Sequence, residues 1–213
     1  VMKNFQTERI ALAAMAVGHA TQALRVTLEH VHDRHVFGVR LFEPDVFPFA
    51  AFVTKTVTPA PRAGNPPPRL WELGAGMINS IGLPNKGLRG YLAEDLPRLA
   101  ELTVPLIVNV MGSTREEVAT LVAAFAEREE VAALELNVSC PNVKTGLMIG
   151  AEPSETAALL DAVRYLTAKP LIVKLTPNVA APAEIAAAAE QGGADAVSLI
   201  NTLKASTIDP ATG

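Results

Sequence analysis

Short apolar runs that alternate with helical segments constrain the fold of this chain more than any other feature. Five such runs occur from residue 50 onward, and each ends in a Lys or an Asn. They are Ala50–Lys55, Pro105–Asn109, Ala132–Asn137, Pro170–Lys174 and Ala196–Asn201. Continuous apolar runs are typical of parallel strands buried on both faces, and strand–helix–strand repetition indicates right-handed βαβ units. The sequence therefore predicts an α/β fold, either a TIM barrel or a doubly wound sheet.

The segments between the runs carry helix start and stop signals. Ser113 and Glu116 form a capping-box pattern before Val118–Phe125, and Pro182 opens an Ala-rich segment that stops at Gly192–Gly193. Residues 59–87 differ, because prolines and glycines crowd there. A disordered linker is one interpretation, but the segment also contains large apolar side chains that can pack. We therefore expect an ordered, functional loop structure between the first two strands.

Residues 1–38 have a different pattern, with apolar side chains at a helical period and no strand signal. They predict one long amphipathic helix, and the expected domains are this helix, 1–38, and an α/β domain, 39–213. Arg9 followed by Ile10–Gly18 resembles a signal peptide. Glu8 lies upstream, however, and the helical period continues past the apolar stretch, so we expect a cytoplasmic protein.

Charge and hydropathy exclude several classes of partner. The net charge is −4 and no Lys/Arg run is present, which argues against a nucleic-acid surface. No apolar stretch reaches the roughly 18 residues that a membrane span needs. The single cysteine excludes an internal disulfide and an iron–sulfur cluster held by this chain alone, and no metal site is predicted.

The polar residues at the ends of the five runs indicate a binding site. A single Asn or Lys after a strand is usually a turn former or a solvated charge. In a parallel barrel, however, all strand ends meet on one face, where active sites are built. Three carboxamides there would suit a planar ring with alternating C=O and N–H groups, and two lysines would suit an anionic ligand. The residues are Lys55, Asn109, Asn137, Lys174 and Asn201.

Cys140 follows one of these strands in the sequence NVSCPN, Asn137–Asn142. A lone cysteine is most often a small buried hydrophobe. This one belongs to a polar strand-to-helix loop, where access is better, so the thiol is a candidate general base.

Several stretches resemble the class 1 dihydroorotate dehydrogenases, the soluble FMN enzymes of pyrimidine (UMP) synthesis, over residues 50–213. The VKLTPNV and INTL forms are closer to the NAD-linked subclass that works with a separate subunit. The matching stretches are VTKTVT, PRAGNPPPRLWE, GMINSIGLPN, PLIVNVMGS, LELNVSCPNVK, PLIVKLTPNV and DAVSLINTL.

This resemblance implies an oxidoreductase with FMN as cofactor. Cys140 would take the C5 proton of dihydroorotate while hydride leaves C6 for the flavin, and Lys174 would lie at the N1/O2 edge of the flavin. FAD and an iron–sulfur cluster would be carried only by the partner subunit, and the chain would form a homodimer. The implied flavin contacts are Lys55, Thr56, Asn109, Asn137, Lys174 and Ile200. The implied substrate contacts are Lys55, Asn79, Ser80, Ile81, Gly82, Leu83, Asn137, Asn142, Asn201 and Thr202.

The chain also departs from this family. The family's first strand and flavin loop are not recognisable before residue 50, and its last strands and phosphate site would follow residue 213. We therefore expect a partial TIM barrel, with about five of the eight strands, preceded by one long helix. Residues 1–38 resemble the start of the C-terminal helical domain of acyl-CoA dehydrogenases through FQTER and DRHVFG, where Arg34 would touch FAD.

Three hypotheses follow from these resemblances. The first is a dihydroorotate-oxidising enzyme, and the second is an inactive, truncated or chimeric fragment that binds FMN or a pyrimidine. The third is an acyl-CoA dehydrogenase fragment, which only the first helix supports. The number of matching motifs favours the first over the third, and the first two remain open.

Overall fold

The computed structural model describes residues 51–73, 76–102, 104–139 and 149–206, together with the backbone of strands β1 (His35–Val36) and β2 (Val39–Arg40). The chain divides into two compact units, Val1–Ala50 and Ala51–Gly213. In the first unit β1 pairs with β2 in an antiparallel manner, so the end of the predicted N-terminal helix is extended instead. The rest of that helix, and the domain boundary predicted at residue 38, lie outside the described residues.

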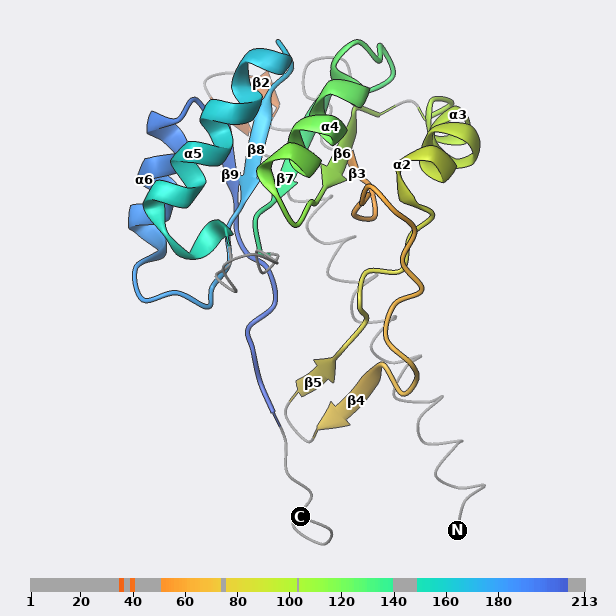
Figure 1. Ribbon diagram of the computed structural model, residues 1–213, viewed down its shortest axis with the longest axis vertical. Helices are drawn as coiled ribbons and strands as arrows, with labels where there is room; N and C mark the ends of the chain where they lie inside the picture. Colours follow the sequence, from red (N-terminus) through yellow and green to blue (C-terminus); the bar gives the residue numbers. More distant parts are fainter. Residues whose placement is uncertain are drawn as a thin grey trace, which may run out of the picture. The chain divides into compact units, whose positions relative to one another are not determined.

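The second unit is built on a five-stranded parallel sheet in the order β3-β6-β7-β8-β9 (Figure 1). Each of the five predicted strands is present, although β3 and β9 are shorter than the apolar runs that predict them. Because the spatial order follows the chain order without a reversal, the sheet is part of a TIM barrel and not a doubly wound sheet. The strands are β3 (Phe52–Val53), β6 (Leu106–Val110), β7 (Ala133–Asn137), β8 (Leu171–Lys174) and β9 (Ala196–Ser198).

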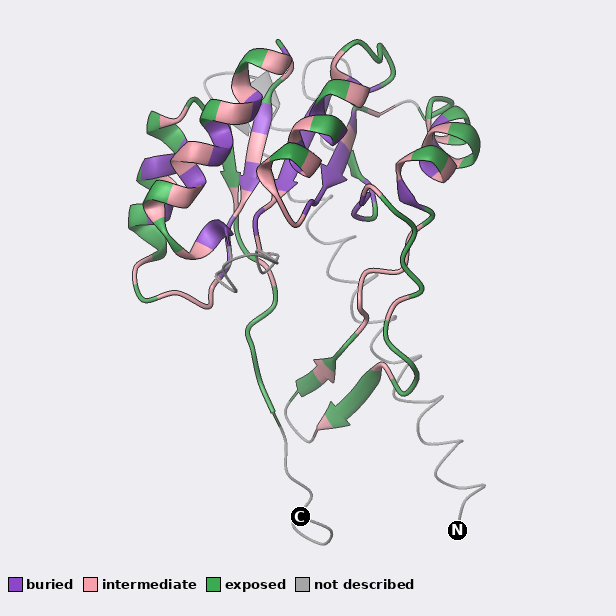
Figure 2. Cartoon of the chain, in the orientation of Figure 1, coloured by how far each residue is buried: buried purple, intermediate pink, exposed green. Residues whose placement is uncertain are grey.

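The helices α4 (Arg115–Ala126), α5 (Pro153–Val163) and α6 (Pro182–Gln191) lie side by side along one face of this sheet (Figure 1). Their buried sides face the strands (Figure 2). Burying a Leu, Ile or Val side chain here stabilises the fold by about 1.5–3 kcal/mol each. The core between helices and sheet includes Leu106, Val108, Val110, Val118, Leu121, Val122, Phe125, Leu134, Leu136, Leu159, Leu160, Val163, Leu171, Val173, Ile185 and Ala189.

Side-chain and backbone caps define the ends of these helices. The Thr114 hydroxyl accepts a hydrogen bond from Glu117 N at 3.2 Å, and Ser113 N donates to the Glu117 carboxylate at 2.6 Å. The capping box is therefore one residue later than the predicted Ser113–Glu116 pair, because the extended backbone of Thr114 places it at the N-cap. Helix α6 ends at Gly192–Gly193 as predicted, with Gly193 in the left-handed region at φ 87°. Short 3-10 turns, η2 (Ile149–Ala151) and η3 (Arg164–Leu166), flank α5.

Residues 59–87 contain an antiparallel strand pair, β4 (Leu70–Leu73) and β5 (Gly76–Asn79), which the sequence did not predict. The segment is ordered around Asn85. Its side-chain oxygen accepts hydrogen bonds from Gly87 N at 2.8 Å and Thr58 N at 3.3 Å, and its NH2 group donates to Leu83 O at 2.9 Å. The chain then continues through α2 (Gly87–Gly90), a π-helical turn η1 (Tyr91–Asp95) and α3 (Leu96–Leu99). None of the helices in the described part of the chain is long and apolar enough to cross a membrane.

Tyr91 joins this segment to the core. Its ring packs edge-on against Phe125 of α4, with ring centroids 5.7 Å apart and an interplanar angle of 82°. Its hydroxyl is buried, and no described residue forms a well-aligned hydrogen bond with it. Burial therefore raises the pKa of Tyr91 from 10.0 to about 12; the nearby Thr54 hydroxyl acts in the opposite direction, and the Asp95 charge adds to the rise.

We predict that Phe125→Ala lowers the free energy of unfolding by about 3–5 kcal/mol, because it leaves a cavity in the best-buried part of the core. Urea denaturation measures this loss. Ala123→Ser, at an exposed position of the same helix, serves as the control and should change stability by less than about 0.5 kcal/mol. A similar small loss for both variants would show that Phe125 is not part of the core.

Tyr91 also predicts a pH dependence of stability. Because the folded state keeps the phenol proton to higher pH than the unfolded state, the free energy of unfolding should fall as pH rises from 10.0 towards about 12. Tyr91→Phe removes this contribution, so the variant should lose less stability than the wild type across that interval. Chemical denaturation at a series of alkaline pH values measures the difference. Parallel stability curves for the two proteins would contradict the buried environment of the phenol.

Candidate functional site

The carboxyl ends of three central strands carry polar side chains on the face of the sheet opposite the helices. Side chains alternate along a strand, and Val108, Leu134 and Leu136 pack into the helical core. Their neighbours Asn109 and Glu135 therefore face the other way. The strand register places Asn109 beside Glu135, and Asn137 beside Lys174.

Glu135 lies at the centre of this face, although the sequence did not single it out. One carboxylate oxygen accepts a hydrogen bond from the side-chain NH2 group of Asn109, and the other accepts one from the Ser198 hydroxyl at 2.7 Å. The Lys174 ammonium lies 3.9 Å from the oxygen that Asn109 contacts. Glu135 itself is only 5% exposed. We call Asn109, Glu135, Lys174 and Ser198 the Glu135 cluster.

Asn109 presents an unsatisfied hydrogen-bond acceptor within this cluster. The residue is 3% exposed, and its side-chain oxygen is buried without a partner among the described residues. A buried acceptor of this kind costs about 1–3 kcal/mol. A ligand that donates an N–H group to it would remove that cost.

Asn137 and Asn201 form a second contact at the strand ends. The Asn201 NH2 group donates to the side-chain oxygen of Asn137 at 3.1 Å, and Ser139 N donates to the same oxygen at 3.3 Å. Since Asn137 belongs to β7 and lies beside Lys174 in register, this pair is next to the Glu135 cluster. The structure therefore brings together four of the five polar strand ends: Asn109, Asn137, Lys174 and Asn201.

Asn178, which sequence reasoning missed, holds the segment after β9. Its NH2 group donates to Thr202 O at 3.0 Å, and its side-chain oxygen accepts from Lys204 N at 2.8 Å. Ile200 in this segment is 49% exposed. Asn178 follows a proline in the VKLTPNV stretch, so the only available signal was that of a turn former.

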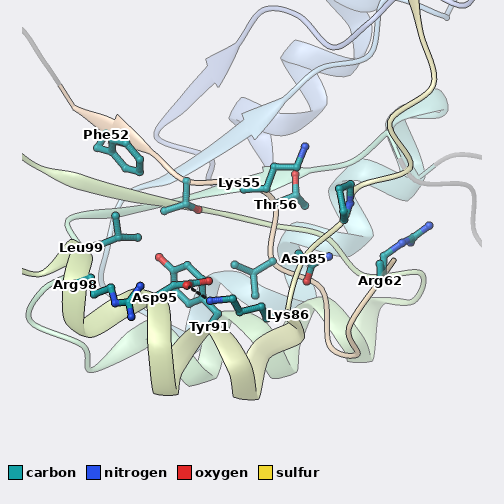
Figure 3. A pocket seen from close by; sticks show the side chains of 13 residues that line it. Phe52, Lys55, Thr56, Arg62, Asn85, Lys86, Tyr91, Asp95, Arg98 and Leu99 are labelled. Carbon is teal, nitrogen blue, oxygen red and sulfur yellow. Dashed lines mark hydrogen bonds and ion pairs between the residues drawn. The ribbon is translucent and has the colours of Figure 1, made fainter. Parts of the chain in front are cut away.

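Lys55 and Thr56 line a cavity of about 570 Å³ between β3 and the α2–α3 segment (Figure 3). Tyr91, Asp95 and Arg98 lie across this cavity, and the Lys55 side chain extends away from Tyr91 (Figure 3). Within the described ranges, no hydrogen bond or ion pair connects Lys55 to the Glu135 cluster. The Lys55 backbone nevertheless lies beside Asn109, because Thr54 N donates to Ile107 O at 3.0 Å and Val57 N donates to Asn109 O at 2.8 Å. A role for Lys55 in the same site therefore stays a prediction.

The predicted substrate loop, Asn79–Leu83, is held by the proline-rich segment before it. The Asn65 side chain donates to the Ser80 hydroxyl at 2.7 Å, and Asn65 N donates to Ile81 O at 3.1 Å. Gly82 has φ 75°, and a Cβ there would lie 2.4 Å from Asn65 N, so only glycine fits. No hydrogen bond or ion pair among the described residues joins this loop to the Glu135 cluster.

Two predicted site residues, Cys140 and Asn142, lie outside the described residues. The described chain approaches them through Ser139, whose backbone N–H is held by Asn137 at the end of β7.

Comparison with known proteins agrees with the motifs in the strand ends. The family model described as dihydroorotate dehydrogenase matches residues 41–212. The family model described as acyl-CoA dehydrogenase, C-terminal domain, matches residues 1–50, so the N-terminal part of the chain is similar to that domain. The two matches overlap over residues 41–50.

Curated relatives include several dihydroorotate dehydrogenase B (NAD(+)) catalytic subunits. That of Desulforudis audaxviator is 51% identical over 78% of this chain and 54% of its own length. The Pelobacter propionicus protein is 48% identical over 78% and 55%, and the Bacillus pumilus protein is 45% identical over 79% and 55%. The chain thus spans about half the length of the curated relatives it matches.

Among solved structures, the carboxyl transferase domain from Rhizobium etli pyruvate carboxylase aligns at a TM-score of 0.40 and 15% identity, over 48% of this chain and 18% of that one. So distant a likeness carries no argument about this chain. The family assignment rests instead on the family match over residues 41–212 and on relatives that are 45–51% identical. This chain belongs to the dihydroorotate dehydrogenase family.

Proposed function

We propose that this chain supplies strand ends that bind FMN and a pyrimidine in an enzyme that oxidises dihydroorotate to orotate, a step of pyrimidine synthesis. The observation that carries the proposal is the side-chain oxygen of Asn109, which is buried without a partner among the described residues and lies near other amide side chains and the Lys174 ammonium. At a position that only packs the core, such an acceptor would destabilise the fold without any compensating contact. A flat heterocycle with alternating C=O and N–H groups would satisfy it.

The residues present fit FMN as the cofactor. Asn109 offers an acceptor, Lys174 offers a positive charge, and Asn137 and Asn201 offer amide groups from adjoining strand ends. Bound FMN would supply the oxidising chemistry, because it accepts the hydride from C6 of dihydroorotate. Lys55, Thr56 and Ile200 complete the proposed flavin contacts.

The substrate side of the proposal rests on the loops at the same strand ends. Cys140 acts as the general base that removes the C5 proton, and the loop Asn79–Leu83 with Asn142, Asn201 and Thr202 binds the ring and its carboxylate. Asn137 supports this arrangement, because its side-chain oxygen holds both Asn201 and the backbone of Ser139, the residue before Cys140.

The names of the relatives support a further part of the proposal. A protein called a catalytic subunit works with another subunit. We propose that the enzyme that contains this segment forms a homodimer and passes electrons to a separate subunit with FAD and an iron–sulfur cluster.

FMN titration of the purified chain tests the cofactor assignment. Wild type should bind FMN, and Asn109→Leu should bind it about tenfold or more weakly, because one buried hydrogen bond is lost and the size of the side chain is kept. Flavin fluorescence quenching measures both affinities, and circular dichroism checks that the variant is folded. If both proteins bind FMN equally well, Asn109 is not a flavin contact. If neither binds FMN, the cofactor assignment to this chain is wrong.

Replacement of Cys140 tests the reaction. In this segment joined to the remaining barrel strands of a relative, Cys140→Ala should bind FMN and orotate but lose about 10²–10⁴ in the rate of flavin reduction by dihydroorotate. Cys140→Ser should keep slightly more activity, because a hydroxyl can still relay a proton.

Stopped-flow flavin absorbance measures these rates. Rapid reduction in the Cys140→Ala protein would exclude the thiol as the base. FMN binding without reduction in the unmutated protein would favour the alternative function, a fragment that only binds flavin or pyrimidine.

A further inference from the structure

Glu135 is a buried carboxylate in a position where the fold itself requires no charge. It lies in the middle of β7, between Leu134 and Leu136, which pack into the helical core. Its side chain points to the opposite face, where it remains only 5% exposed. Burying a carboxylate costs several kcal/mol unless its oxygens are paired, and apolar residues of similar volume are often as stable. If Glu135 has a role beyond packing, the side chains that it contacts must show what that role is.

The first partner is Asn109, and Glu135 determines which way its amide faces. A carboxylate can only accept hydrogen bonds, so Asn109 must direct its NH2 group towards Glu135. The amide oxygen then faces away, and this is the atom that is buried without a partner among the described residues. The Asn109 backbone N–H is also held, by the Thr54 hydroxyl at 3.0 Å. Glu135 thus sets the direction in which the side-chain oxygen of Asn109 points.

The second partner is Lys174, the proposed cation at the flavin. Its ammonium lies 3.9 Å from Glu135 and is the only cation near this carboxylate among the described residues. The Lys174 side chain remains 32% exposed, so one side of the cation still faces outward. The Ser198 hydroxyl occupies the other carboxylate oxygen at 2.7 Å, which keeps the carboxylate in one orientation.

We infer that Glu135 is a positioning residue that orients the Asn109 amide and balances the Lys174 charge for the flavin. This inference rests on the proposed function of the same site. Glu135 touches neither substrate nor cofactor in this account. It acts through the two residues that do, so removing its hydrogen bonds and removing its charge should have separable effects.

Two variants separate these effects. Glu135→Leu removes the acceptor, so the Asn109 amide can turn and FMN binding should weaken about tenfold or more. Glu135→Gln keeps an acceptor for Asn109 and removes only the charge. Its FMN affinity should change less than that of Glu135→Leu, while the midpoint potential of bound FMN should rise, because a more positive site favours the reduced flavin, which carries more negative charge.

Glu155→Gln is the matched control, since it also removes an ion-paired carboxylate. Glu155 pairs with Arg115 at 2.8 Å between the first turns of α5 and α4, and no hydrogen bond or ion pair among the described residues joins it to the Glu135 cluster. Affinity and midpoint potential should both stay at wild-type values in this variant. A purely structural role for Glu135 would lower the stability of its variants but leave the potential of Glu135→Gln unchanged, and that result overturns the inference.

A measurement without flavin separates this inference from the proposed function. In the FMN-free chain, the NMR signals of the Asn109 side-chain NH2 group can be assigned by their loss in Asn109→Leu. They should be shifted and slow to exchange in wild type and Glu135→Gln, and should move to free-amide values in Glu135→Leu. If they do so while wild type fails to bind FMN, the positioning by Glu135 holds and the cofactor assignment is wrong. Unchanged signals in Glu135→Leu overturn the inference whether or not FMN binds.

Discussion

The alternation of side chains along the parallel strands governs both the stability and the chemistry of the second unit. On β7, Leu134 and Leu136 pack into the helical core. Glu135 and Asn137 alternate with them and therefore face the opposite side of the sheet. A slip of one residue in the register would place the carboxylate in the helical core and the leucines at the site. The same packing that stabilises the sheet therefore keeps the polar groups on one face.

Charge burial is the main energetic problem of this face. Glu135 loses its hydration, and the two hydrogen bonds and the nearby ammonium of Lys174 offset that cost. The cost of burying the Asn109 amide is offset only in part, because its NH2 group has a partner and its oxygen has none among the described residues. An incompletely satisfied network is unfavourable in an empty protein and favourable once a ligand completes it. We take that imbalance as the physical sign of a binding site.

The sequence was sufficient for the sheet and for most of the strand-end contacts. Continuous apolar runs predicted all five parallel strands. Their polar terminal residues, Lys55 included, predicted a shared site, and the structure connects Asn109, Asn137, Lys174 and Asn201. Glu135 was missed because a single acid inside an apolar run gives no sign of which face it occupies until the register is known. The β4–β5 pair was missed because prolines and glycines mask a strand pattern. The cap at Thr114 was misplaced because the segment contains two overlapping capping-box patterns.

Lys55 is the strand end whose role the strand pairing alone does not decide. It lies beside Asn109 across the β3–β6 pairing and also lines the cavity beside Tyr91, but no hydrogen bond or ion pair among the described residues joins it to the Glu135 cluster. The central claim is that the unpaired oxygen of Asn109 marks the ligand-binding face. A crystal structure of the chain with FMN tests this most directly. We expect a ring N–H of the flavin to donate to the Asn109 side-chain oxygen, with Lys174 beside the same ring. A flavin bound in the cavity beside Tyr91, with the Asn109 oxygen still unpaired, would contradict the account.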